Sequence, residues 1–494
     1  MEQVAAKPDS DSSTRHFLLC RWIFARVLGA IFFCAFASLG VQARGLIGAN
    51  GISPAAEFLR AVREQLGGAA WLDVPTLCWI NASDGFLVGL CIAGCVLSAI
   101  MIAGFAPGAC TFVLWALYLS LCSVGSPFLN FQWDALLLET ALLAVFYLPW
   151  KLRPDWSYES RVNRVARWLL WWLLFRLMFA SGVVKLSSGD ETWRTLTALR
   201  VHFETQPLPI WTAWYVHQLP WWLLRACEAI MFAIELGAPF LIVAPRRLRH
   251  TAAAALIFLQ VCILATGNYA FFNLLTIALC LLLFEDGAWP QRWTARFTPQ
   301  IDARAVTTRS LWLYGSVLSI VVIATSMPLL DAFRSGWRWP EPFSGLRNSL
   351  APFSSFNGYG LFAVMTTTRP EIFVEGSDDG VNWQPYRFRW KPGNLRIPPA
   401  LVAPHQPRLD WQMWFAALSD YQHNPWFIRF LVRLLEGSPE VLALLEWNPF
   451  PNHPPRYVRA VVYDYHFTHW GDEAWWTRGE EKLYCPPISL RKEE

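Results

Sequence analysis

Hydrophobic and polar positions divide the chain into two parts. Long apolar runs recur through residues 1–330, whereas residues 331–494 mix apolar and polar positions as an ordinary soluble domain does. A helix needs roughly 20 apolar residues to cross a bilayer, and fewer when it lies inside a bundle. The pattern predicts about nine membrane segments, with the third, fourth, seventh and eighth short. They are 17–41, 86–105, 109–124, 134–150, 166–186, 221–244, 251–267, 270–285 and 309–330.

The second part predicts a β-rich module with inserted helices. Residues 370–390 read as strand, turn and strand around the turn sequence SDDG, and residues 456–468 alternate as a further strand. Residues 411–418 and 424–437 have helical periodicity, and Gly437 is a suitable end for the second helix. We therefore predict a polytopic α-helical membrane bundle followed by a C-terminal β-rich α+β domain. The expected division is a disordered cytoplasmic tail (1–15), a transmembrane bundle (16–330) and a soluble domain (331–494).

Composition supports membrane integration and excludes several other classes. The hydrophobic fraction of 54% and the mean hydropathy of +0.29 are too high for a soluble globule. The net charge of +4 is small, and basic residues stand beside apolar runs, so we expect no nucleic-acid partner. The eleven cysteines form neither a CxxC motif nor a zinc-binding spacing, and we predict no metal and no cofactor. Arg21 and Arg26 interrupt the first apolar run, which favours a retained span over a signal peptide.

Loop charges give an orientation, because positive residues concentrate in cytoplasmic loops. With the N-terminus in the cytoplasm and an odd number of spans, the loops on that side hold most of the Lys and Arg residues. These are Lys151, Arg153, Arg161, Arg164, Arg167, Arg246, Arg247, Arg249, Arg292, Arg296 and Arg304. On the opposite side, Arg44, Arg60, Arg63, Arg194 and Arg200 stand near Asp or Glu residues. The C-terminal domain is therefore predicted to be non-cytoplasmic.

Ionisable residues inside the apolar segments are the first candidates for function. Such groups are costly in lipid and usually face a bundle interior, where they partner one another. We predict an intramembrane polar cluster made of Asp134, Glu139, Arg176, Lys185, Glu235 and Asn273. Arg176 is expected to pair with either Glu235 or Glu139, as a clasp between helices.

Lys185 is the one residue with a specific chemical hypothesis. A lysine in apolar surroundings binds its proton less tightly and can act as a base. Its position at a helix end, taken alone, favours instead an ammonium group that reaches the membrane surface. The predicted orientation places Glu228, His202 and Asn268 on the same outer side. These residues are expected to shape an outward-facing polar cavity around Lys185.

The sequence resembles the lipase maturation factor family from about residue 120 onward. The resemblance is carried by SPFLNFQWDALLLET (126–140), LLFRLMFASGVVKLSSGDETW (173–193), HFETQPLP (202–209), IELGAPFLI (234–242), TGNYAFFNLLTIALCLLL (266–283), YGLFAVMTTTRPEI (359–372), VAPHQPRLDWQMWFAAL (402–418) and NPFP (448–451). It implies a chaperone-like protein of the secretory pathway that helps secreted lipases fold and assemble. It also implies the endoplasmic reticulum membrane with a lumenal C-terminal domain, or the cytoplasmic membrane in a bacterial host. The family supplies no catalytic residues to carry over.

A shorter similarity points to different chemistry. FASGVVKLSSGDETW (179–193) looks like the segment of vitamin K-dependent gamma-carboxylases that contains the active-site base, at the position of Lys185. This chain has one lysine there, whereas those enzymes have two in succession.

Two functional hypotheses follow from these resemblances. In the first, the protein is a non-enzymatic maturation factor, and Trp411, Trp414 and Trp426 present an aromatic surface to a lipase client. In the second, it is a membrane enzyme of carboxylase-like ancestry that uses Lys185 as base on a lipophilic cofactor or substrate. A transporter is disfavoured, because the outer domain is large and the spans show no repeat symmetry.

Overall fold

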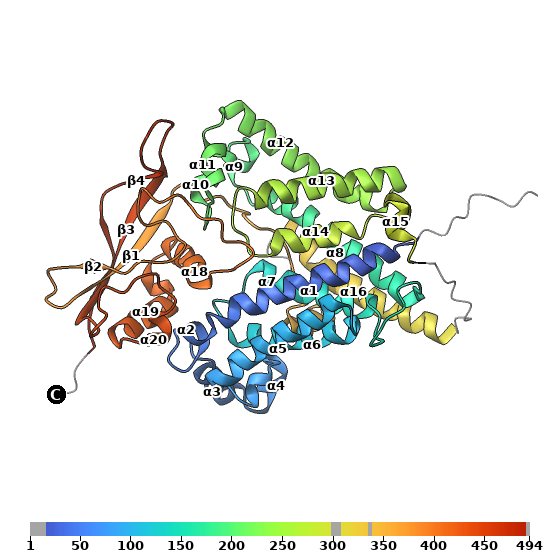
Figure 1. Cartoon of the computed structure of the whole chain (residues 1–494), viewed down its shortest axis with the longest axis horizontal. Helices are drawn as coiled ribbons and strands as arrows, with labels where there is room; N and C mark the ends of the chain where they lie inside the picture. The colour runs from blue at the N-terminus through green and yellow to red at the C-terminus, as the bar shows by residue number, and fades with distance from the viewer. Residues whose placement is uncertain (1–15, 298–307, 334–337, 491–494) are drawn as a thin grey trace, which may run out of the picture.

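The protein is a bundle of long helices with a small sheet at one end. The computed structural model describes residues 16–297, 308–333 and 338–490. The long helices lie side by side along the longest axis of the molecule (Figure 1). The sheet stands beyond one end of them, and α18 to α20 lie between the sheet and the bundle. The predicted disordered tail, residues 1–15, lies outside the described residues.

Nine apolar helical segments form the bundle at the positions that the hydrophobicity pattern predicts. Among the described residues, seven have the length and hydropathy of a membrane span. They are α1 (Leu18–Gly40), α5 (Asp84–Ala103), α6 (Pro107–Val124), α8 (Arg161–Ser187), α12 (Trp221–Gly237) continued by η3 (Ala238–Val243), α13 (Arg246–Leu264) and α16 (Thr308–Phe333). The other two, α7 (Gln132–Tyr147) and α14 (Phe272–Leu281), are shorter.

The lengths of the short segments confirm part of the prediction and correct another part. The fourth and eighth segments are short, as expected. The third and seventh are long enough to span, because α6 begins at Pro107 and α13 begins at Arg246. Proline suits the first position of a helix, since its missing N–H would be unpaired there anyway. The first turn of α13 is helical but basic, so a search for apolar residues does not include it.

Shorter helices connect the long ones. Towards the sheet lie α2 (Ala43–Ile47), α3 (Ala55–Leu66), α4 (Ala70–Asp73), α9 (Glu191–Arg194), α10 (Leu199–Thr205), α11 (Trp211–His217) and α17 (Phe343–Leu350). At the opposite end lies α15 (Gln291–Thr294). Single 3-10 turns occur at η1 (Gly67–Ala69), η2 (Leu77–Trp79), η4 (Asp286–Ala288), η5 (Ala351–Phe353) and η6 (Tyr421–His423). Most of these elements are too short to show a full hydrophobic period.

The helix α1 packs closely against α5 because glycines remove side chains from the contact. A Cβ added at Gly94 of α5 would overlap the ring of Phe36 of α1. A Cβ added at Gly29 of α1 would lie 3.0 Å from the side chain of Ile102. In lipid, where apolar burial gives little driving force, small residues stabilise helix pairs by allowing this close approach.

The connections of the bundle gather at two ends. At the end remote from the sheet, the Asp286 carboxylate accepts hydrogen bonds from the N–H groups of Leu18 and Leu19, both at 3.0 Å. The Arg21 guanidinium donates to the carbonyl oxygen of Tyr147 at 2.8 Å. These bonds connect the start of α1 to the end of α7 and to the segment that follows α14. The helices therefore alternate in direction, and the last of them, α16, runs towards the sheet (Figure 1).

The sheet is antiparallel and five-stranded, in the order β2-β1-β3-β4 with β5 also paired to β3. Its strands are β1 (Pro370–Ser377), β2 (Gln384–Pro385), β3 (Tyr457–Phe467), β4 (Trp476–Arg478) and β5 (Lys482–Ile488). The accompanying helices are α18 (Arg408–Ala417), α19 (Pro425–Leu435) and α20 (Pro439–Leu442). We call residues 369–490 the sheet domain. Its core joins Ile372 and Val374 of β1 to Phe427 and Phe430 of α19.

The elements predicted for this domain are confirmed. The SDDG turn lies between β1 and β2, and its Gly380 adopts a φ of +75°, which favours glycine. The helix α19 ends before Gly437, whose φ is +68°. The second strand of the predicted hairpin is only two residues long.

We expect Gly94→Leu to loosen the bundle, whereas Gly89→Leu on the same helix will be tolerated. A side chain at residue 94 forces α1 and α5 apart, and overpacking of this kind costs about 1–3 kcal/mol. A Cβ at Gly89 meets nothing within 4 Å. Thermal unfolding in detergent, followed by the fraction of monodisperse protein, measures the difference. Equal unfolding temperatures for the two variants would contradict the close contact.

Candidate functional site

Several almost fully buried charges lie where the sheet domain meets the bundle. Asp134 begins α7 and accepts two hydrogen bonds from the guanidinium of Arg408 in α18, at 2.8 and 2.9 Å. The hydroxyl of Tyr118 donates to the same carboxylate at 2.5 Å, and Arg408 also donates to the carbonyl oxygen of Phe128 at 2.7 Å. Asp134 is 2% and Arg408 1% exposed. Bidentate pairing of this kind fixes both partners in one geometry.

The surroundings of this pair explain how it is stabilised. Burial opposes the positive charge on Arg408, but Asp134 outweighs that effect and raises the pKa of the guanidinium. Asp134 lies in the first turn of α7, where the helix dipole favours a negative charge. Two ions taken out of water are compensated here only because both are hydrogen-bonded. The pair therefore holds the domain in one position and leaves no charge free.

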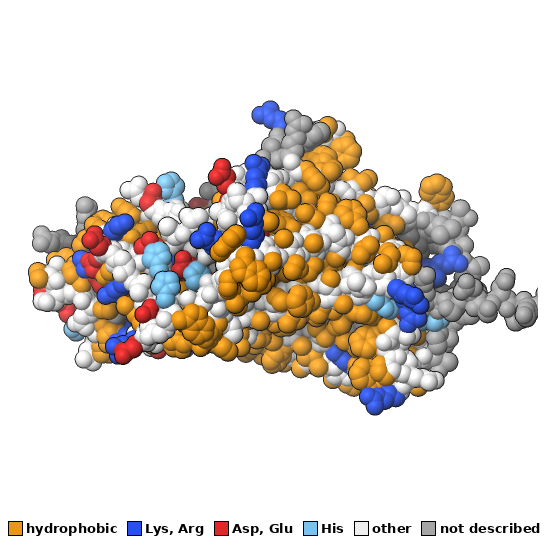
Figure 2. Space-filling view, turned by 90° about the horizontal axis from the view of Figure 1, so that it is seen from above, with side chains coloured by type: hydrophobic (Ala, Val, Ile, Leu, Met, Phe, Trp, Pro, Cys, Tyr) orange, Lys and Arg blue, Asp and Glu red, His pale blue; other side chains and the backbone are white. Residues whose placement is uncertain are grey.

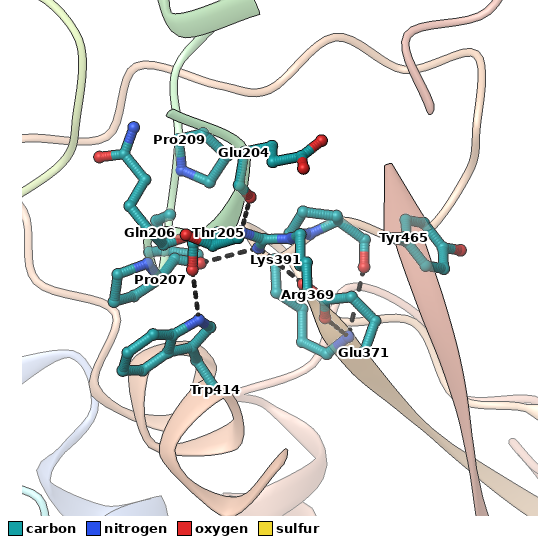
Figure 3. A network of polar contacts seen from close by, with 12 residues as sticks. Glu204, Thr205, Gln206, Pro207, Pro209, Arg369, Glu371, Lys391, Trp414 and Tyr465 are labelled. Atoms are coloured by element: carbon teal, nitrogen blue, oxygen red, sulfur yellow. Dashed lines mark hydrogen bonds and ion pairs between the residues drawn. The ribbon is translucent and has the colours of Figure 1, made fainter. Parts of the chain in front are cut away.

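Arg369 makes a second connection, from the residue before β1 to the segment after α10 (Figure 3). Its guanidinium donates to the carbonyl oxygens of Glu204 (2.6 Å), Gln206 and Pro207 (3.0 Å), and to the Glu371 carboxylate at 2.6 Å. Burial lowers the pKa of Arg369, and Glu371 acts against that shift. One side chain thus binds three backbone carbonyl groups within four residues.

Neighbouring side chains complete the network of Figure 3. Lys391 donates to the second oxygen of Glu371 at 2.8 Å, so this carboxylate joins two cations. The indole N–H of Trp414 donates to the carbonyl oxygen of Thr205 at 2.8 Å. The carboxylate of Glu204 accepts from the backbone N–H of Phe467, at the end of β3, at 3.0 Å. Segment 204–207 is therefore bonded to the domain through both its backbone and its side chains.

Asn268, one of the predicted site residues, makes the third connection. Its amide oxygen accepts from the backbone N–H groups of Val402 (2.7 Å) and Ala403 (2.9 Å). Its amide nitrogen donates to the carbonyl oxygens of Ala400 (2.8 Å) and Leu208 (3.1 Å). The four bonds use the hydrogen-bonding capacity of this amide. Three of them join the turn between α13 and α14 to the sheet domain, and the fourth holds Leu208, in the segment after α10.

The remaining charged residues of the spans form separate pairs. Arg176 binds Glu139, one of the two partners that the sequence left open. The same carboxylate accepts from the hydroxyl of Tyr359 at 2.6 Å and from the N–H of Asn357 at 3.2 Å. The pair therefore also fixes the chain segment that leads from α16 to the sheet domain.

Lys185 pairs with Glu235, which the sequence had offered to Arg176. Its ammonium group lies 2.8 Å from each carboxylate oxygen and 3.2 Å from the carbonyl oxygen of Ser181. An ammonium group has three donors, and these three contacts use them all. The sequence hypothesis required Lys185 to face a cavity, whereas the structure places it in an ion pair between α8 and α12.

The other candidates around Lys185 bind partners of their own. Glu228 accepts from the N–H of Leu199 at 3.3 Å, and its second oxygen is buried without a hydrogen-bond partner among the described residues. The imidazole of His202 lies 3.4 Å from the hydroxyl of Tyr269. Burial, aided by the charge of Lys185, lowers the pKa of His202 to about 4, so this histidine is neutral at pH 7.

The predicted single polar cluster is therefore three ion pairs in different places. Asn273 is bound elsewhere, since its amide donates to the side-chain oxygen of Gln260 at 2.8 Å. Two surface cavities are found among the described residues, and the larger of the two adjoins the Arg176–Glu139 pair, because its lining includes Asn357. One, of about 350 Å³, is bordered by Asp331 and Arg347, and the other, of about 160 Å³, lies between α19 and the loop 448–454.

Trp411, Trp414 and Trp426 are core residues in this structure. They are 3%, 8% and 4% exposed. The ring of Trp411 lies 4.7 Å from that of Trp133 in α7, and the ring of Trp426 lies 5.6 Å from that of Phe128. The expected aromatic client surface at these positions is thus corrected by their burial. They pack the sheet domain against the bundle.

Sequence reasoning missed Arg369 and Arg408, which make the two central contacts of the junction. Both lie in segments with the pattern of a soluble domain, where an arginine is ordinarily exposed and gives no sign of a buried partner. A signal existed within the predicted cluster, which holds three acidic residues but only two basic ones. In the structure the two basic residues bind Glu139 and Glu235, and Asp134 takes its cation from the sheet domain.

These contacts define a polytopic helical membrane protein with a sheet domain docked on one end. The sequence model of the lipase maturation factor transmembrane domain matches residues 19–291, and that of the lipase maturation factor C-terminal domain matches residues 355–486. The chain is 36% identical to lipase maturation factor 2 of Homo sapiens over 588 aligned positions, which cover 96% of this chain and 83% of that protein. It is 34% identical to lipase maturation factor 1 of Bos taurus over 509 positions, with 96% and 89% covered.

The chain therefore belongs to the lipase maturation factor family. This confirms the resemblance found in the sequence. No solved structure matches the chain.

We expect Arg408→Ala to destabilise the protein strongly, because it leaves the Asp134 carboxylate buried without its cation. Removing one partner of a buried pair costs about 3–5 kcal/mol. The double variant Arg408→Met with Asp134→Leu will recover most of that loss, since no ion then remains buried. Thermal unfolding in detergent and limited proteolysis of the sheet domain measure the effect.

A matched control is Arg459→Ala, which removes a half-buried pair with Glu375 within the sheet. Its expected cost is about 1 kcal/mol or less, as for other partly exposed pairs. If Arg408→Ala behaves like this control, Asp134 and Arg408 do not hold the domain on the bundle.

Proposed function

We propose that this protein is a membrane-bound maturation factor that helps secreted lipases to fold and assemble. The names of its relatives supply the activity, and the two family models together cover most of the bundle and of the sheet domain. The observation that carries the proposal is the use of charge. Asp134, Glu139 and Glu235 each bind a cation, and Asn268 makes three hydrogen bonds that join the domain to the bundle. Such an arrangement suits a fixed scaffold.

We further propose that the sheet domain is on the non-cytoplasmic side. The end of the bundle remote from the sheet carries the basic residues that the sequence assigned to the cytoplasm. Those among the described residues include Lys151, Arg153, Arg161, Arg164, Arg246, Arg247, Arg292 and Arg296. Such residues favour the cytoplasmic side of a membrane. The domain would then face the lumen of the endoplasmic reticulum in a eukaryotic host, or the outside of the cytoplasmic membrane in a bacterium, where secreted lipases fold.

Labelling of single cysteines tests this orientation. We expect Val381→Cys, at a site 77% exposed in the sheet domain, to react with a membrane-impermeant maleimide added outside the cytoplasm. Arg153→Cys, on the exposed loop between α7 and α8, will react only after the membrane is permeabilised. Both variants need Cys227→Ser and Cys262→Ser, because these two cysteines are exposed. The reverse pattern would place the sheet domain in the cytoplasm.

The alternative function, a membrane enzyme with Lys185 as base, makes a different demand. A base has to reach its substrate in the geometry of reaction. Lys185 is 6% exposed, and all three of its donors are engaged by Glu235 and Ser181. We therefore propose that Lys185 and Glu235 act as a clasp between α8 and α12. The clasp matters through protein stability and not through chemistry.

A pair of variants separates the two functions. Lys185→Met leaves Glu235 buried without a cation, so we expect the amount of folded protein to fall and lipase maturation to fall with it. Adding Glu235→Met removes the buried charge and fills a similar volume, so both quantities will recover together. The readout is secreted lipase activity per amount of lipase protein, in a host that lacks other members of this family. Empty vector gives the baseline.

The informative outcome is a double variant that is folded but inactive. Normal protein level without lipase maturation would show that the amine of Lys185 takes part in chemistry, and it would overturn the scaffold proposal. If the unaltered protein does not raise lipase activity above the empty-vector baseline, the maturation role itself is overturned.

A further inference from the structure

Five exposed aromatic side chains form a patch where the sheet domain reaches the start of α12. They are Trp211, Tyr215, Trp221, Trp222 and Trp470, and we call them the aromatic patch. Their exposed fractions are 47%, 41%, 61%, 60% and 65%. Large aromatic rings are rarely exposed together on a surface that meets only water, and contiguous patches of this kind mark interaction sites.

The β3–β4 connection and α11 fix the position of Trp470. The β3–β4 connection turns tightly at Gly471, whose φ is +95°, and the N–H of His469 donates to the carboxylate of Asp472 at 2.9 Å. The ring of Trp470 lies 5.1 Å from that of Trp214 and 5.5 Å from that of Tyr215, both in α11. The exposed ring of Trp470 therefore lies at the tip of a well-defined hairpin.

Side-chain hydrogen bonds attach this hairpin to α11. The indole N–H of Trp214 donates to the hydroxyl of Thr468 at 3.0 Å, and the amide of Gln218 donates to the carbonyl oxygen of Thr468 at 2.8 Å. Trp214 itself is buried. Figure 1 shows β4 beside α10 and α11, whereas α18 lies nearer to α7. The hairpin contact is thus separate from the Asp134–Arg408 contact.

The patch is continuous with a surface that faces lipid. Trp221 and Trp222 are the first residues of the candidate span Trp221–Val243. The same span exposes Ile230 and Phe240, at 54% each. Figure 2, which looks onto this side, shows hydrophobic side chains over the bundle and charged side chains gathered over the sheet domain. The patch includes residues of both parts, since Trp221 and Trp222 begin the span and Trp470 belongs to the sheet domain.

We propose that the aromatic patch lies in the headgroup region of the bilayer, and that Trp470 anchors the sheet domain to the membrane surface. Trp and Tyr prefer this region because they combine an apolar ring with a polar N–H or O–H group. Lipid is favoured over a protein partner because the patch begins within the first turn of a span. The sheet domain would then be held by the bilayer as well as by the bundle.

A reporter at the hairpin tip tests the proposal in the full-length protein. Trp470→Cys, in the Cys227→Ser and Cys262→Ser background, is labelled with the environment-sensitive fluorophore NBD and reconstituted in phosphatidylcholine nanodiscs. We expect blue-shifted emission and severalfold stronger quenching by nitroxide-headgroup lipid than for the matched control Val381→Cys. Val381 is also apolar, at 77% exposure, and it follows the SDDG turn at the other hairpin tip. The background protein without an added cysteine, treated with NBD in the same way, corrects for labelling of other cysteines.

A second position guards against misfolding of the first variant. His469→Cys keeps Trp470 and places the reporter on an exposed neighbour, and it should show the same quenching as residue 470. Quenching at 469 and 470 that equals the value at 381 would overturn the proposal. So would NBD emission that ignores lipid but shifts when a folding lipase is added, because the patch would then be a protein-binding surface.

Discussion

The ion pair between Asp134 and Arg408 is the contact on which the arrangement of this protein depends. It joins a carboxylate at the start of a bundle helix to a guanidinium in the sheet domain, and both are almost fully buried. Such a pair adds little net stability over an apolar contact, but losing one partner is very costly. Its value lies in specificity: the sheet domain has one docked position in which neither charge is stranded. Arg369 and Asn268 reinforce that position with hydrogen bonds to backbone groups.

Two further buried carboxylates of the bundle are also paired with cations. Glu139 binds Arg176, and Glu235 binds Lys185, so each of these carboxylates has its own cation. Groups at membrane depth are commonly signs of transport or catalysis. Here they connect helices to one another and to the chain that leads to the sheet domain.

Local patterns were sufficient to predict the elements but not the junction. Apolar runs located every long helix, because hydrophobicity along a span is a local property, and the alternation in 456–468 located β3. The partner of Lys185 lies 50 residues away and that of Asp134 lies 274 residues away, and no local pattern encodes such distances. Trp411, Trp414 and Trp426 were misplaced for a related reason. An indole ring suits an exposed interface and a buried one equally well, and only the docked fold decides between them.

The order of synthesis gives the Asp134–Arg408 pair a further consequence. Asp134 enters the membrane while the 274 residues before Arg408 are still to be made, so the nascent bundle carries an unmatched carboxylate throughout that interval. The bundle can close around this residue only after the C-terminal region has been delivered to the same side. A chain that is truncated before Arg408, or whose C-terminal region is inserted on the wrong side, would keep the Asp134 carboxylate without this cation. A factor proposed to supervise the folding of other proteins thus contains a check on its own.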